Sequence, residues 1–546
     1  MFSRVISAAV YGIDAYIVNV ETDVGFGLPT FDMSGALGSK VREAKDRVRV
    51  AIKNSGIELT PQKIVINISP ANIRKEGTIY DLPIAIGILA ANGCFDLKIL
   101  ENVLIIGEVS LDGSINPVKG VLPMVCAAKE AGIDNCIIPK ANIAEGRIMN
   151  NINIYGVETL SQTIEILKNI AVIDGSRKNI KQADVKSGEC NKSDGNINND
   201  TYNVLERSRV KFTYGSEVKN NNHSCSYNID YSDISGQEAA KRATMIAVSG
   251  MHNIMYIGPP GSGKTMLAQR IPTIMPDMDY EEQLRLTKIY SVAGLLDSEG
   301  GIMVKRPFRN PHHTITQAAL LGGAVPRPGE ITLSEGGVLF LDEMTEFNQV
   351  IMEALRQPLE DKVITLVRVN AAYTYPAHFM LAAAINPCKC GYYPDRNRCH
   401  CSEYDIRRYI GRISNPMWDR FDMCVKVDEV SYEVMRNKGN VDTIYNSTDM
   451  KNKVEAARQM QKDRFKKLDI NYNSQMGVRE IHKYCTLNVE CNELMERMYK
   501  QHHMSARAYN KVLKTARTIA DLKGSVNIEK EHLTEALFYK NCEVKS

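Results

Sequence analysis

A phosphate-binding loop is the clearest chemical signal in the sequence. Its pattern is G-x-x-x-x-G-K-T, formed by Gly258, Pro259, Pro260, Gly261, Ser262, Gly263, Lys264 and Thr265. Glycines at this spacing let backbone N–H groups turn toward phosphate oxygens. The lysine supplies a cation for the β- and γ-phosphates, and the threonine hydroxyl is suited to Mg²⁺. The motif therefore predicts a site for ATP and Mg²⁺, in contrast to a plain glycine-rich turn.

Two adjacent carboxylates form the expected partner of this loop. Asp342 and Glu343 follow the apolar run 337–341, which is typical of a buried strand. We predict that Asp342 acts on the Mg²⁺ shell and that Glu343 polarises the attacking water. A third strand-like run, residues 379–385, ends at Asn386, whose amide could position that water. The asparagine is a weak signal alone, but it comes third in the expected order.

The elements around these residues predict an α/β architecture. Residues 253–257 read as a strand entering the loop and residues 266–271 as a helix leaving it. Strand and helix patterns alternate over 231–428, as in a parallel sheet. The remainder, 429–546, is helix-rich, and its helix over 506–522 stops at a glycine.

The N-terminal part reads as a separate α/β domain over residues 1–171. Strands are expected at 16–20, 63–68 and 103–106, and helices at 41–55, 82–92 and 121–131. Residues 172–230 are rich in Asn, Lys, Asp, Ser and Gly, so they cannot bury enough apolar surface to offset the loss of chain entropy. We interpret them as a flexible linker, the alternative being a surface insertion within one domain.

Composition sets outer limits on function. The chain has 546 residues, of which 44% are apolar, so it can fill more than one core. Its net charge is only +3, and any nucleic-acid surface must therefore be a local patch. We find no signal peptide and no run suited to crossing a bilayer. These features predict a cytoplasmic protein without membrane contact.

Four of the 13 cysteines form two C-x-C pairs: Cys388 with Cys390, and Cys399 with Cys401. Four thiolates can close a tetrahedral Zn²⁺ site, and a cysteine cluster in a reducing compartment more often binds metal than forms disulfides. The spacing departs from the usual C-x-x-C, and His400 is a spare ligand. The alternative is four reduced cysteines in a loop.

Together these motifs resemble an AAA+ ATPase of the magnesium-chelatase-like ComM/YifB family. Besides the loop and the acidic pair, the resemblance rests on the segments 233–237, 306–314, 322–323 with 328–330, 355–360, 386–391, 412–416 with 419–422, and 505–509. It covers nearly the whole chain apart from the linker. It implies a Lon-protease-like N-terminal domain, an AAA+ domain and a helical lid.

The resemblance also implies a homo-hexameric ring with ATP between subunits. A neighbour's arginine would complete each site; motif position favours Arg420, with Arg356 as the alternative. Arg507 would be a second sensor acting on its own subunit's nucleotide. The family implies a DNA helicase or translocase that promotes branch migration in recombination or natural transformation. A chelatase-type ATPase, a protein-remodelling motor and a non-enzymatic nucleotide-binding scaffold remain alternatives.

Two segments of the AAA+ domain are candidates for DNA contact. One is an insertion that carries Lys305, Arg306, Arg309, His312, His313 and Arg327. The other is a hairpin expected over 363–375, which carries Tyr373 and Tyr375 and whose tip could face a ring pore. Basic groups suit phosphates and aromatic rings suit base stacking. The same loops could instead pack subunits together, or contact nucleotide across an interface.

The N-terminal domain resembles the Lon protease domain without its catalytic pair. Ile79 stands at the position of the nucleophilic serine, and Leu122 at that of the lysine base. Neither side chain can supply a hydroxyl or an amine, and Lys75 and Lys119 are offset by several residues. We predict a domain with no peptidase activity that serves assembly or partner contact.

Overall fold

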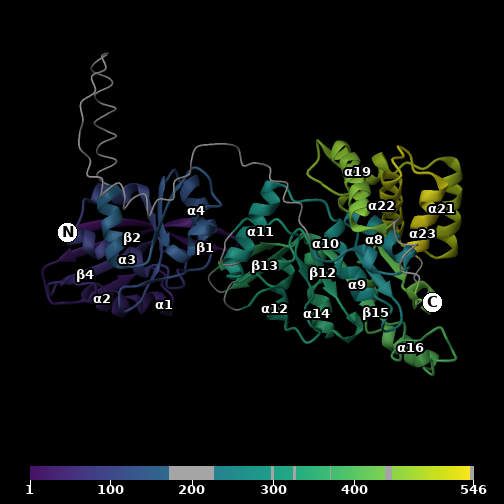
Figure 1. The fold of residues 1–546 in the computed structure, drawn as a ribbon, viewed down its shortest axis with the longest axis horizontal. Helices are drawn as coiled ribbons and strands as arrows, with labels where there is room; N and C mark the ends of the chain where they lie inside the picture. Colours follow the sequence, from purple (N-terminus) through teal and green to yellow (C-terminus); the bar gives the residue numbers. More distant parts are fainter. Residues whose placement is uncertain (171–226, 297–300, 324–326, 369–370, 437–444, 541–546) are drawn as a thin grey trace, which may run out of the picture. The chain divides into compact units, whose positions relative to one another are not determined.

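The computed structural model describes residues 1–170, 227–296, 301–323, 327–368, 371–436 and 445–540 (Figure 1). The predicted linker, 172–230, lies outside the described residues apart from 227–230. The chain divides into two compact units, and each is described by itself. One unit contains the N-terminal domain together with Leu284–Met303 and Thr365–Tyr373; the other contains the remaining described residues.

The N-terminal unit is built on a seven-stranded sheet in the order β3-β4-β2-β1-β5-β8-β9. Its strands are β1 (Phe2–Tyr11), β2 (Asp14–Gly25), β3 (Phe31–Ser34), β4 (Lys63–Ser69), β5 (Val103–Ile105), β8 (Asn135–Pro139) and β9 (Asn153–Val157). The long β1–β2 hairpin is antiparallel, whereas β1, β5, β8 and β9 run parallel. The sheet is therefore mixed.

Helices α3 (Asp81–Ala91) and α4 (Val121–Glu130) pack against this sheet, and α2 (Ala44–Asn54) packs against α3. Helix α3 is apolar on every side and buried along its whole length, so it lies within the core. Its first residue, Asp81, pairs with Arg47 of α2 at 2.8 Å. This ion pair gives the buried carboxylate a partner where α2 meets α3.

Two later segments of the chain belong to the same unit. Helix α11 (Tyr280–Ala293) contributes Lys288, which pairs with Asp14 at 2.9 Å, and Ser291, which hydrogen-bonds Glu145. The ring of Tyr373 packs against that of Tyr11, with centroids 4.8 Å apart. The N-terminal domain thus holds two pieces of chain that follow the phosphate-binding loop in sequence.

The second unit contains a five-stranded, fully parallel sheet in the order β11-β12-β15-β10-β16. Its strands are β11 (Phe308–Arg309), β12 (Val338–Leu341), β15 (Met380–Ile385), β10 (Ile254–Ile257) and β16 (Met423–Lys426). Every residue of β10, β12 and β15 is buried, as expected for parallel strands covered on both faces. Adjacent parallel strands bring the chain segments that follow them to one edge.

The C-terminal region is helical, as predicted. It comprises α19 (Ser447–Phe465), α20 (Val478–Tyr484), α21 (Val489–Gln501), α22 (Ala506–Leu522) and α23 (Lys530–Lys540). Helix α22 begins where the Ser505 hydroxyl accepts the N–H of Ala508, and it packs against α8 (Glu238–Gly250), α19 and α23. This packing joins the lid core to the sheet core. Among the described residues, no helix is both long and apolar enough to cross a membrane.

Candidate nucleotide site

The phosphate-binding loop leaves β10 at Gly258 and enters α9 (Lys264–Gln269). A Cβ on Gly258 would lie 2.1 Å from the carbonyl oxygen of Val427, so only glycine fits. Gly261 and Gly263 have φ values of +78° and +90°, a region that side chains rarely enter. The glycines therefore permit the loop geometry that the motif predicts.

Lys264 is held between the loop and the neighbouring strand. Its ammonium donates to the carbonyl oxygens of Gly258 at 2.8 Å and Pro259 at 2.7 Å, and to Asn386 Oδ1 at 3.1 Å. Burial lowers the pKa of Lys264 to about 8, against the opposing charges of Asp342 and Glu343. The structure thus brings Lys264 and Asn386 together.

The depressed lysine pKa gives a first testable expectation. At pH 8 about half of the Lys264 side chains are neutral in the nucleotide-free protein, and phosphate binding restores the charged form. Binding of ADP at pH 8 should therefore take up about half a proton, and affinity should fall as pH rises from 7 to 9. Titration calorimetry in two buffers of different ionisation enthalpy measures this uptake. No proton uptake at pH 8 would contradict it.

Thr265 and the acidic pair form the metal side of the site. Thr265 Oγ1 donates to Asp342 Oδ2 at 2.8 Å, and Asp342 Oδ1 accepts the N–H of Glu343 at 3.0 Å. Adjacent ligands of an octahedral Mg²⁺ lie about 3 Å apart, so this hydroxyl and carboxylate fit the ion. Glu343 adopts the left-handed region at φ 50° and starts the turn after β12. Its side chain is exposed.

Arg420 lies at the other end of the sheet. Asn253, which immediately precedes β10, donates from Nδ2 to the Arg420 carbonyl at 3.0 Å and from its backbone to Asp422 at 3.0 Å. The phosphate-binding loop follows the opposite end of the same strand, about 13 Å away for four residues. Arg420 is therefore remote from the loop of its own subunit.

Glu360, near the end of α15 (Arg356–Asp361), forms ion pairs with two arginines. Its carboxylate pairs with Arg420 at 2.5 Å and with Arg507 at 3.5 Å. Arg420 is 12% exposed, and its Nε has no hydrogen-bond partner among the described residues. A buried N–H without a partner is costly and is often explained by function. The structure places Arg507, which the family resemblance assigns to its own subunit's nucleotide, on the same carboxylate as Arg420.

The four cysteines come together after β15. Their sulfur atoms all lie within 4.8 Å of one another, with Cys388 Sγ 3.3 Å from Cys390 Sγ and 3.7 Å from Cys399 Sγ. Zn–S bonds of about 2.3 Å in a tetrahedron place sulfurs about 3.8 Å apart. The donor set and its spacing therefore fit one Zn²⁺.

Most of the proposed DNA-contacting side chains have partners inside the protein. Arg306 donates to the carbonyls of Pro276 and Gly336 and pairs with Glu282, and Arg309 forms a bidentate pair with Glu330 at 2.6 and 2.7 Å. The predicted hairpin forms as β13 (Val363–Arg368) and β14 (Ala371–Pro376), but Tyr375 is fully buried. Of the basic candidates in the insertion, Lys305, His312 and Arg327 are exposed.

The N-terminal domain shows no catalytic pair at the Lon positions. Leu122 is fully buried, and the backbone N–H of that residue donates to Glu145. Lys75 is also buried, which lowers its pKa, and its ammonium donates to the carbonyl of Pro70. The hydroxyl of Thr78 donates to Glu108. No described hydroxyl–amine pair is formed by these residues.

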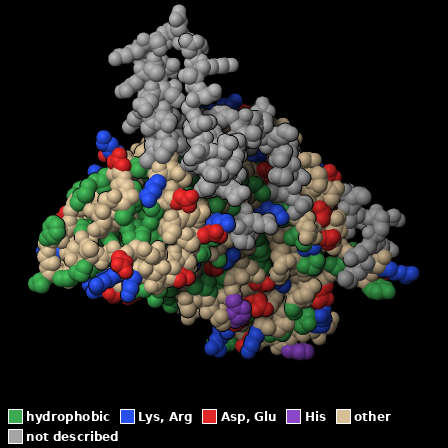
Figure 2. Space-filling model, turned by 60° about the vertical axis from the view of Figure 1, so that its left-hand side comes forward, with side chains coloured by type: hydrophobic (Ala, Val, Ile, Leu, Met, Phe, Trp, Pro, Cys, Tyr) green, Lys and Arg blue, Asp and Glu red, His purple; other side chains and the backbone are tan. Residues whose placement is uncertain are grey.

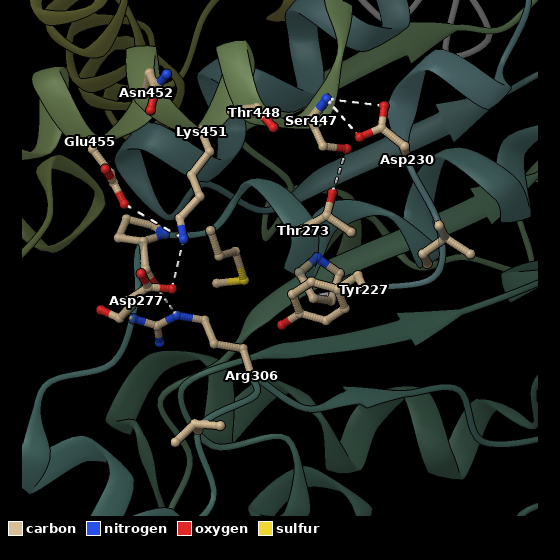
Figure 3. A pocket seen from close by; sticks show the side chains of 15 residues that line it. Tyr227, Asp230, Thr273, Asp277, Arg306, Ser447, Thr448, Lys451, Asn452 and Glu455 are labelled. Atoms are coloured by element: carbon tan, nitrogen blue, oxygen red, sulfur yellow. Dashed lines mark hydrogen bonds and ion pairs between the residues drawn. The ribbon is translucent and has the colours of Figure 1, made fainter. Parts of the chain in front are cut away.

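A separate pocket of about 430 Å³ lies between α10 (Ile271–Ile274) and α19 (Figure 3). Its polar groups have partners: Lys451 pairs with Asp277 at 2.7 Å, and the Ser447 N–H donates to Asp230 at 3.2 Å. No residue of the phosphate-binding loop lines it. We interpret it as a packing feature beneath the lid and assign it no ligand.

Two residues of this region were given no role by the sequence alone. Glu360 ends a segment that supports the family resemblance, but nothing in that segment indicates that it receives both arginines. Gly391 follows Cys390, and its closeness to Pro260 depends on tertiary folding: a Cβ there would lie 2.4 Å from Pro260 Cδ. The sequence offers one indication, the glycine itself, because glycine is favoured where the backbone adopts a conformation that other residues avoid.

Three family models match the chain: "Magnesium chelatase, subunit ChlI" over residues 230–435, "Subunit ChlI of Mg-chelatase" over 20–142 and "Magnesium chelatase, subunit ChlI C-terminal" over 445–540. Competence protein ComM of Haemophilus influenzae is 36% identical over 539 residues, covering 98% of this chain and 97% of that protein. Protein YifB of Escherichia coli is also 36% identical, with the same coverage. The archaeal Lon protease of Thermococcus kodakarensis is 31% identical over 151 residues, 27% of this chain and 23% of that protease.

Proposed function

The chain belongs to the ComM/YifB family of magnesium-chelatase-like AAA+ ATPases, and from this we propose that it is an ATP-driven ring motor acting on DNA. Its N-terminal domain is related to Lon proteases, and its motor is a parallel α/β domain followed by helices. ATP and Mg²⁺ are the cofactors that this family implies.

The main support for a ring-shaped assembly is the separation of Arg420 from the phosphate-binding loop of its own subunit. The Arg420 backbone lies at the opposite strand end, which supports a role for its guanidinium at the γ-phosphate of a neighbouring subunit. Arg507 shares its carboxylate partner, so we assign both arginines to the neighbour's nucleotide. This assignment replaces the expectation that Arg507 acts within its own subunit. A closed hexamer satisfies every such head-to-tail contact.

The chemistry follows from the positions of the remaining groups. Lys264 binds the phosphates, Thr265 and Asp342 hold Mg²⁺, and bound Mg²⁺ neutralises charge on the phosphates. Glu343 orients and polarises the attacking water, while Asn386 holds Lys264 and faces the same edge. The neighbour's arginines stabilise the charge that develops as the γ-phosphate leaves.

DNA is the substrate we favour, because one of the relatives that match nearly the whole chain is named a competence protein. The basic side chains on the face in Figure 2 are interspersed with acidic ones and form no continuous patch. The exposed basic candidates for a local contact are Lys305, His312 and Arg327. We propose translocation that promotes branch migration during recombination or natural transformation.

DNA-stimulated ATP hydrolysis tests this substrate assignment. Branched DNA should raise the turnover number, and half-stimulation should need much more DNA as salt rises from about 50 to 200 mM. A Lys305→Ala/Arg327→Ala variant should keep basal turnover and need more DNA for the same stimulation. Turnover that no nucleic acid changes would favour the second candidate, a protein-remodelling or chelatase-type motor, which is consistent with the internally paired Arg306 and Arg309.

We also propose that the cysteine cluster holds a structural Zn²⁺. Burial raises the pKa of Cys390, but backbone and thiol hydrogen bonds outweigh it and lower the pKa to about 7. Elemental analysis of the purified protein should find one zinc per chain. Cys399→Ser should lose it, whereas Cys424→Ser, a cysteine on β16, should retain it. Zinc-free native protein would contradict the site.

A further inference from the structure

We propose that the cysteine loop, residues 386–401, braces the nucleotide site, so that Zn²⁺ on its thiols controls the affinity for ATP. The inference rests on the proposed zinc and nucleotide sites and adds a coupling between them. The thiols need not touch nucleotide for this. The loop contacts the nucleotide site at three separate places, and each is described in turn.

The first contact is through Asn386. Its side-chain oxygen accepts a hydrogen bond from Lys264 at 3.1 Å, and the zinc ligand Cys388 follows two residues later. Cys388 is fully buried, and its sulfur accepts the N–H of Tyr393 at 3.4 Å. A shift of this sulfur therefore moves the group that holds the phosphate-binding lysine.

The second contact is through Gly391. Its backbone lies directly on the phosphate-binding loop, since an added Cβ would be 2.4 Å from Cδ of Pro260 and 3.7 Å from its nitrogen. The residue has a φ of +89°, which a side chain would strain. The zinc ligand Cys390 immediately precedes it. The metal therefore fixes the loop backbone where it supports Pro260.

The third contact is through Arg398. Its guanidinium lies 3.9 Å from the Tyr392 ring centroid and pairs with Glu429 at 2.7 Å. Glu429 continues the segment whose Val427 carbonyl lies against Gly258. In the same segment, the Asp428 carbonyl accepts from Gln237, which also donates to the Ser262 carbonyl. The loop thus reaches the underside of the site as well.

Metal is what can hold the loop in this form. Residues 386–402 contain no helix or strand, and besides the Gly391 and Arg398 contacts they are held by turns around Asp395 and by the four sulfurs. Thiols are weak hydrogen-bond donors and acceptors, whereas Zn–thiolate bonds contribute folding energy outright. A displacement of about 1 Å in a positioning group can cost about 100-fold in function. Loss of zinc should therefore displace Asn386 and Pro260, and through them Lys264.

The test is titration of the full-length protein with a fluorescent ADP analogue, with zinc measured on the same samples. Chelator-stripped protein should bind at least ten-fold more weakly, and added Zn²⁺ should restore the affinity. If ADP affinity does not change when zinc is removed, the coupling is wrong, while the zinc and nucleotide sites themselves are not contradicted. Absence of zinc from native protein would remove the metal site, and failure of zinc-loaded protein to bind nucleotide would contradict the proposed function.

Gly391→Ala separates bracing from general damage, because it leaves all four thiols intact. We expect zinc to be retained and ADP affinity to fall about ten-fold. Gly524→Ala is the matched control: φ is +70° there too, but nothing lies within 4 Å of the added Cβ, so affinity should not change. Should Gly391→Ala lose zinc, Arg398→Ala provides the second variant, with zinc retained and weaker binding expected. If Gly391→Ala and Arg398→Ala both retain zinc and both bind ADP with unchanged affinity, the bracing role is wrong.

Discussion

Replacing Arg420 with alanine should lower the turnover number for ATP about 10³- to 10⁵-fold. This range is typical of an arginine that is supplied to a nucleotide site by another subunit or protein. Nucleotide affinity should change little, because the Arg420 backbone contacts Asn253 at the strand end opposite the phosphate-binding loop. Steady-state hydrolysis and binding of a fluorescent ADP analogue, measured on the same preparation, separate the two effects.

Arg356 provides the comparison that gives this result its meaning. It lies on the helix that carries Glu360 but pairs with Glu353 one turn earlier. Arg356→Ala should keep most of the turnover. Normal hydrolysis by Arg420→Ala would contradict the assignment, and a loss confined to Arg356→Ala would transfer the role to that residue.

Glu343→Gln is expected to lower turnover about 10²- to 10⁴-fold, the usual contribution of a positioned general base. The amide keeps the shape of the side chain but cannot polarise the water. ATP should still bind, because Lys264, Thr265 and Asp342 are unchanged. Quantifying ATP and ADP released from the denatured complex should show intact ATP on the protein.

Glu346→Gln is the matched control for this substitution. It removes the same charge three residues later, where the carboxylate forms an exposed pair with Arg412. Exposed pairs contribute little, so both turnover and affinity should stay close to those of the unmodified protein. Equal losses in both variants would indicate a general charge effect and would contradict the role of Glu343.

The centre of the site could be predicted because each part follows a buried strand. Lys264, Asp342 and Asn386 come directly after, or a few residues beyond, apolar runs, and adjacent parallel strands must bring such segments to one edge. Several strands and helices were also predictable, because each contains a clear run of apolar residues. The runs at 16–20 and 63–68 lie within β2 and β4, and the apolar segment 82–92 closely matches α3.

The periphery of the site could not be predicted, since it depends on contacts between distant segments. Nothing in the spacing of Arg507 indicates that it shares Glu360 with Arg420. Arg306 and Arg309 read as exposed basic groups, yet their carboxylate and carbonyl partners lie elsewhere in the chain. The expected helix over 41–55 is split into α1 (Ser39–Arg42) and α2, with Glu43 between them. Local pattern does not fix such a break.

Mixing two inactive variants tests the shared site most directly. Lys264→Ala lacks a working phosphate loop but keeps Arg420, and Arg420→Ala lacks the arginine but keeps the loop. If the arginine acts on a neighbour, the mixed rings contain interfaces with both groups intact, and ATP hydrolysis returns on mixing. If the mixture stays as inactive as its components, although native gel or light scattering shows that the two variants assemble together, the arginine does not act between subunits and the account of the site is wrong.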